Sequence, residues 1–183
     1  MTPQDFLYMG CFLNRIAARY KRNPLRINPI QVLKDFYELA SPEEHVEAFG
    51  RFCIPAMEDQ FKWDNGSPAN GLFYGQQLEI LIEATFIIYK KSPTTKTNNS
   101  HQQKSEKKKL PMILCNTELE NPSTFLEIFF ATASLPRWKE RIHTFTSAAI
   151  SNSSVMDELS GTDIFIFINS IPKLIYAAHR LLP

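Results

Sequence analysis

The sequence predicts an all-α protein: a compact bundle of about six or seven helices, forming a single domain over residues 1–183 with a flexible polar insert. Apolar residues recur at helical spacing through most of the chain, and several of these stretches open with Thr, Asn or Ser followed by Pro, as helices often begin. Strand-like apolar runs are limited to two short segments, 110–115 and 164–168. With 44% hydrophobic and 21% charged residues, the composition is that of an ordinary globular protein.

The first third of the chain carries three helix starts. Thr-Pro at residues 2–3 begins a helix predicted to run to about residue 22, and Asn-Pro at 28–29 begins a second that ends near residue 40. A third helix starts at the capping box Ser-Pro-Glu-Glu and is closed or kinked by Pro55.

A loop and a long helix are predicted next. Residues 64–71 concentrate turn formers and predict a loop, so the helix is expected from about 72 to 91. Between residues 78 and 89 only three side chains are polar, which indicates a helix at the centre of the bundle.

Residues 92–109 form the polar insert. They include no large apolar side chain and carry five Lys against one Glu, so they cannot repay the entropy of ordering. We expect a flexible segment there, with a tether to nucleic acid or to a membrane surface as the alternative. Periodicity does not decide whether the following run, 110–115, is a strand or a packed extended segment.

Two helices are predicted between residues 121 and 151. Asn-Pro at 121–122 begins the first and Ser-Leu-Pro at 134–136 begins the second. Their spacing predicts these core residues: Phe125, Ile128, Phe129, Ala133, Trp138, Ile142, Phe145 and Ala149.

The last segment, 164–182, starts with the β-branched and aromatic content of a strand. We favour a helix that Asp163 caps and that continues through a kink at Pro172, because a lone strand would leave its backbone groups unpaired. Asn169, Pro172, Lys173, His179 and Arg180 interrupt the apolar run, so no membrane span is expected.

Charge and cysteine content narrow the class of protein. The net charge of +1 gives no global attraction to nucleic acid or anionic lipid. Cys11, Cys53 and Cys115 are odd in number and far apart, which predicts reduced core thiols rather than disulfides. No signal peptide precedes the first helix, so a cytoplasmic location is expected.

We expect a protein-interaction or regulatory module. Fourteen Phe, six Tyr and two Trp are more aromatic residues than a small core needs, so some are expected on a surface that faces a protein partner, which could be a second copy of the chain. The predicted core positions show no cluster of catalytic side chains, no cofactor motif and no metal motif. Whether the protein is an enzyme is left open.

Nucleic-acid binding is the first alternative. Arg15, Arg19 and Arg22 lie at positions i, i+4 and i+7 of the predicted helix 2–22 and therefore share one face. Such an arginine stripe could contact phosphates. It could instead be a solvated face, pairing with the acidic residues at 43–47.

A polar or metal site in a helical enzyme is the second alternative. Glu79 and Glu83 lie one turn apart on the most apolar helix, and Glu140 with His143 has the E-x-x-H spacing of carboxylate-bridged sites. However, a dinuclear site would need that spacing twice, and His143 is expected to point away from the core. Glu79 and Glu83 could also form the solvent-facing stripe of their helix. His45 and His179 are expected to be partly exposed helix residues.

The seven residues from Arg137 to His143 also resemble the R-x(4–6)-H motif of the HEPN helical ribonucleases. The resemblance implies an arginine and a histidine that act on the RNA backbone. Trp138 departs from that pattern, because a polar residue commonly follows the arginine in the family. The likeness covers these seven residues alone and does not assign the chain to the family.

Overall fold

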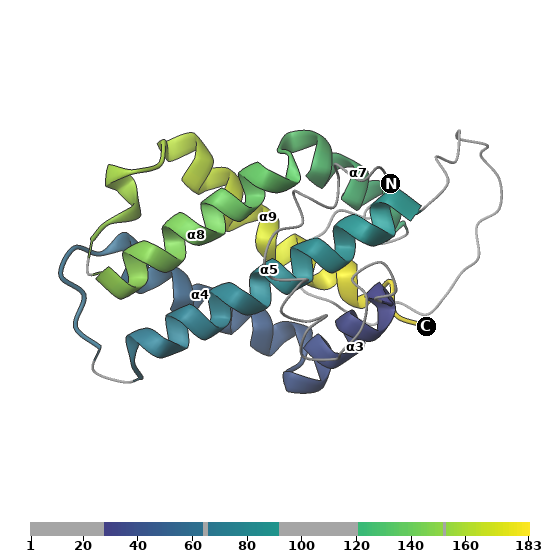
Figure 1. Ribbon diagram of the computed structural model, residues 1–183, viewed down its shortest axis with the longest axis horizontal. Helices are drawn as coiled ribbons and strands as arrows, with labels where there is room; N and C mark the ends of the chain where they lie inside the picture. Colours follow the sequence, from purple (N-terminus) through teal and green to yellow (C-terminus); the bar gives the residue numbers. More distant parts are fainter. Residues whose placement is uncertain (1–27, 64–65, 92–120, 152) are drawn as a thin grey trace.

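The computed structural model describes residues 28–63, 66–91, 121–151 and 153–183. Within these ranges the chain forms six α-helices and one short 3-10 helix, and no strand (Figure 1). The elements are α3 (Pro29–Leu39), α4 (Pro42–Met57), α5 (Pro68–Lys91), α7 (Pro122–Thr132), α8 (Leu135–Ser151), η2 (Val155–Asp157) and α9 (Gly161–His179). The predicted all-α class is confirmed, while the predicted helix 2–22, the insert 92–109 and the run 110–115 lie outside the described residues.

Side-chain caps start the helices where the sequence indicated. Asn28 accepts a hydrogen bond from the amide of Ile30 at the start of α3, and Asn121 accepts one from Ser123 at the start of α7. At α4 the predicted capping box is complete. The hydroxyl of Ser41 accepts a hydrogen bond from the Glu44 amide, and the carboxylate of Glu44 accepts one from the Ser41 amide. These bonds satisfy amides that have no partner within the helix.

The start of α5 differs from the prediction. The helix begins at Pro68, inside the segment expected to be a loop, because proline at a first helical position loses no hydrogen bond. Gly71 lies within this early turn and is buried close to Ala149 of α8 and to Trp63. Packing against α8 therefore outweighs the weak helix propensity of these residues.

Helix α5 forms the centre of the bundle, as its apolar circumference predicted. It packs against all five other α-helices of the described residues, and most extensively against α8, which lies antiparallel beside it (Figure 1). At Gly75 the two helices leave no room for a side chain, because an added Cβ would clash with Oγ1 of Thr146.

The core contains most of the residues that helical spacing placed there. Trp138 is fully buried, stacks on Phe129 with the ring centroids 4.1 Å apart, and donates its indole N–H to the carbonyl of the same residue. The prediction for Ile128 was wrong, because this side chain is 51% exposed. Leu126 takes the third core position of α7 instead, and Ile128 lies about 200° from it around the helix axis.

The segment that began like a strand is helix α9, as favoured. Its cap is Ser160 rather than Asp163: the Ser160 hydroxyl accepts from the Asp163 amide and donates to the Asp163 carboxylate. Pro172 lies within the helix without ending it. None of the described helices is both long enough and apolar enough to cross a membrane.

Three further side chains test the predicted environments. Cys53 is a buried free thiol, as predicted, whereas Cys11 and Cys115 lie outside the described residues. His45 is buried, contrary to expectation. It stacks on Phe36 with centroids 3.9 Å apart, and its Nε2 lies 3.0 Å from the Phe36 carbonyl, while burial lowers its pKa. His179 is exposed at the C-terminal end of α9.

Candidate functional site: an apolar groove beside helix α9

The two acidic residues predicted on α5 have different environments. Glu83 is fully buried and accepts a hydrogen bond from Lys139 of α8, so it does not belong to a solvent-facing stripe. Its second oxygen, Oε2, is buried without a hydrogen-bond partner. Burial raises the pKa of Glu83 to about 7, although the hydrogen bond and the charge of Lys139 act to lower it. Glu79 is partly buried one turn earlier.

These residues do not form a metal centre. Glu140 is exposed and pairs with Arg137, while His143 is exposed on the same helix, as its predicted helical phase required. Glu83 is paired with a lysine, which opposes cation binding there. Across the described residues, no three His, Cys, Asp or Glu side chains gather where they could hold a metal ion.

An ion-pair cluster joins α8 to the first turn of α9. Asp163 accepts hydrogen bonds from Arg141 at 2.7 Å, from Arg137 at 2.9 Å and from the hydroxyl of Ser160. The pKa of Asp163 is lowered, first by its bond from Arg141. Arg141 is almost fully buried, and its guanidinium carbon also lies 4.7 Å from the Trp138 ring centroid. This cluster fixes the start of α9 against α8.

The arrangement gives no support to the ribonuclease-like reading of Arg137 and His143. Arg137 and His143 are six residues apart on one helix, so their side chains lie about 120° apart around the helix axis. Arg137 is engaged by Glu140 and Asp163, whereas His143 is exposed and makes no hydrogen bond or ion pair within the described part of the chain. Arg15, Arg19 and Arg22 lie outside the described residues.

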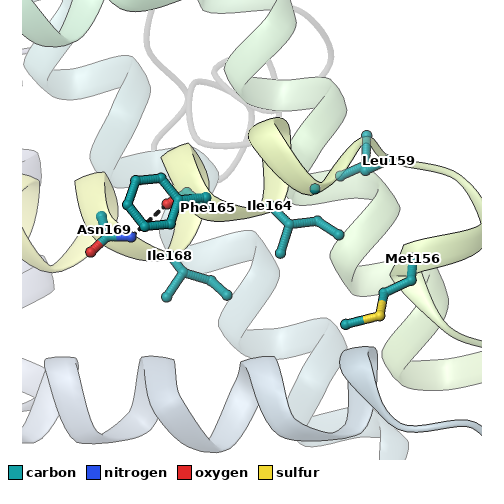
Figure 2. Close-up of a pocket in the computed structure, with 7 residues that line it drawn as sticks. Met156, Leu159, Ile164, Phe165, Ile168 and Asn169 are labelled. Carbon is teal, nitrogen blue, oxygen red and sulfur yellow. Dashed lines mark hydrogen bonds between the residues drawn. The ribbon is translucent and has the colours of Figure 1, made fainter.

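An apolar groove lies between the η2 segment and the first turns of α9. It is a hollow of about 420 Å³ lined by Met156, Leu159, Gly161, Ile164, Phe165, Ile168 and Asn169. Figure 2 shows the side chains of Ile164 and Ile168 on the same side of α9, with Met156 reaching toward them from the preceding segment. None of these seven residues, which belong to the described part of the chain, is charged.

The groove also carries the two most exposed large apolar side chains of the described residues. Phe165 is 68% exposed and Met156 is 60% exposed, whereas Leu159 and Ile164 are buried at the base. The one polar side chain, Asn169, donates a hydrogen bond to the carbonyl of Phe165 one turn earlier. The groove therefore combines a hollow with protruding apolar groups.

Local sequence explains how the groove forms. Ile164, Phe167 and Ile171 occupy the buried face of α9, so Phe165 and Asn169 point outward on the other face. Ser154 starts η2 by accepting from the amide of Met156, and this turn holds Met156 in front of α9. The Asp163 ion pairs hold the helix in place one residue before Ile164.

Helical phase alone could have identified Phe165. The run 164–168 is apolar on every side, and a helix that packs against one layer must then expose part of it. The exposure of Met156 could not be predicted in this way, because a 3-10 helix of three residues is too short to show a hydrophobic period. The sequence also did not predict the ion pairs of Lys139, Arg141 and Asp163, because ion pairs between different helices follow no fixed spacing along the chain.

No family model matches this sequence, and neither the curated proteins nor the solved structures include a significant match. The fold and the site define an all-α protein with an apolar surface groove.

Proposed function

We propose that the protein is a protein-interaction module and that the groove beside α9 is its binding surface. One observation carries the proposal: the two most exposed large apolar side chains, Phe165 and Met156, line the same apolar hollow. Single exposed apolar residues are common on proteins, but clustering around a hollow is typical of interaction sites. Covering a phenylalanine contributes roughly 2 kcal/mol to association.

The chemistry of the lining favours a protein partner over a catalytic substrate. Its seven residues include no acid, base or nucleophile, so the groove offers apolar contact and one amide. Asp163 and Arg141, at the start of α9, are engaged with each other. A partner that inserts an aromatic or long aliphatic side chain would match this surface.

The partner that we propose is a second copy of the chain. A two-fold interface needs one patch that is complementary to itself, so the patch must hold both a protruding group and a hollow. Phe165 supplies the first and the hollow beside it supplies the second, with a volume large enough for an aromatic ring. None of the seven lining residues is charged, so covering the groove with a second copy places no charged side chain in the hollow itself.

Sedimentation velocity over a range of concentrations tests the proposal. The wild type should form a dimer, and Phe165→Ser or Met156→Ser should shift the dissociation constant upward by about tenfold or more. Ile128→Ser is the matched control, since Ile128 is similarly exposed on α7 but lies outside the groove lining. A wild type that stays monomeric, or a dimer that Ile128→Ser weakens as much as Phe165→Ser, would refute it.

A further inference from the structure

A second pocket, separate from the groove, lies where α5 ends and α8 begins. It has a volume of about 340 Å³ and is lined by Phe86, Tyr89, Lys90, Phe130, Ser134, Leu135 and Pro136. The C-terminal part of α5 lies beside α7 there (Figure 1), and no residue is shared with the groove beside α9. Ligand pockets commonly start at about 300 Å³, so this one suits a ligand of one or two rings.

Three aromatic rings form one wall of the pocket. Phe130 of α7 meets Phe86 edge-on, with centroids 5.1 Å apart, and stacks on Tyr89 at 5.3 Å with 25° between the rings. A planar aromatic ligand can extend such a cluster by stacking or by an edge-to-face contact.

Lys90 gives this wall a positive charge. Its ammonium nitrogen lies 5.4 Å from the ring centroid of Phe86 and 5.7 Å from that of Tyr89. No acidic residue lines the pocket, and no carboxylate lies within ion-pair distance of Lys90 in the part of the chain that the structure describes. Ser134 adds a hydroxyl that can donate to an anion.

We propose that this pocket binds a small aromatic carboxylate. The rings of Phe86, Tyr89 and Phe130 contact the aromatic part of the ligand, while Lys90 and Ser134 face its carboxylate. A neutral aromatic would gain the stacking without the ion pair, and an aromatic ligand with an alkylammonium group would be repelled by the ammonium group of Lys90. The site is independent of the interaction groove and of any self-association through it.

Titrations followed by amide NMR shifts test this site with three indole probes of similar size: indole-3-carboxylate, indole-3-carboxamide and 3-(aminomethyl)indole. The carboxylate should give saturable shifts around Lys90 and Ser134, and the carboxamide should bind about fivefold more weakly. Lys90→Gln should reduce the carboxylate affinity about fivefold and leave the carboxamide affinity unchanged. Lys91→Gln, the adjacent exposed lysine, is the matched control and should change neither.

Three results would overturn the proposal. The first is the absence of saturable shifts at carboxylate concentrations up to about 10 mM, because such a low affinity would not be specific recognition. The second is an equal effect of Lys90→Gln and Lys91→Gln, which would show that only general positive charge matters. The third is tighter binding of the amine than of the carboxylate, which would make the three rings a cation site.

Discussion

Lys139 of α8 donates a hydrogen bond to Oε1 of Glu83, a carboxylate on α5 that is fully buried. The bond joins the two helices that pack most extensively, and it leaves Oε2 of Glu83 without a partner. Removing a charge from water costs more than one such bond returns, which explains why the pKa of Glu83 is raised despite the lysine.

This pair predicts a pH-dependent stability. The folded protein keeps the Glu83 proton up to about pH 7, whereas the unfolded chain loses it near the ordinary value of 4.5. The contribution of Glu83 to stability is therefore full below about pH 4.5 and is lost as the pH rises through 7, a change of about 3 kcal/mol. Glu83→Gln should abolish this change.

Urea unfolding of wild type and Glu83→Gln between pH 4.5 and 8 measures the effect as a difference. The difference is needed because His45, with its lowered pKa, contributes the opposite trend, since its stabilising effect grows as the pH rises. Glu140→Gln, at an exposed ion pair, is the control and should leave the pH profile nearly unchanged. Parallel profiles for wild type and Glu83→Gln would contradict the account.

Trp138→Ala should lower the free energy of unfolding by about 3–5 kcal/mol, because it removes a fully buried aromatic side chain together with its stacking on Phe129. His143→Ala, on the exposed face of the same helix, should change it by less than about 0.5 kcal/mol. Denaturant midpoints of the two variants measure both values. A larger effect from His143→Ala would show that the helical phase of α8 is wrong.

Gly75→Ala should destabilise by about 1–3 kcal/mol, because the new methyl group of α5 clashes with the buried Thr146 hydroxyl of α8. Gly50→Ala is the matched control on α4, where an added Cβ meets nothing within 4 Å, and it should stabilise by up to about 1 kcal/mol. Adding Thr146→Ala to Gly75→Ala should recover part of the loss. Equal effects of the two glycine substitutions would exclude this steric explanation.

The arginine stripe gives a prediction from sequence alone. Replacing Arg15, Arg19 and Arg22 together with Gln should leave the unfolding midpoint nearly unchanged, because Gln keeps a good helix propensity. If these arginines contact phosphates, the change should lower the slope of log affinity against log salt by about 2.7 for duplex DNA. Unfolding of the triple variant would instead mean that the arginines are structural.

How much of the molecule the sequence predicts depends on the kind of signal. Caps such as Asn28 and Asn121 are local, so the sequence locates the helix starts well. The burial of Trp138 could be predicted because the apolar residues of its helix recur at helical spacing. Glu83 could not be placed, because its burial depends on a lysine 56 positions further along the chain.

The groove beside α9 also depends on contacts that the local sequence does not reveal. Helical phase can indicate that Phe165 faces outward, but the position of Met156 in front of it depends on a turn without periodicity. The hollow between them is a product of tertiary packing between η2 and α9. The aromatic surplus of the sequence predicted an exposed aromatic surface without indicating where it lies.

Isotope-filtered NOE spectroscopy on a mixture of labelled and unlabelled protein shows directly whether two copies associate through the groove beside α9. We predict intermolecular NOEs between the Phe165 ring of one copy and the methyl groups of Met156, Ile164 and Ile168 of the other. Phe165→Ser should remove them, while Ile128→Ser should not. Absence of these NOEs at concentrations where the protein self-associates, or intermolecular NOEs confined to another surface, would show that the groove is not the interface.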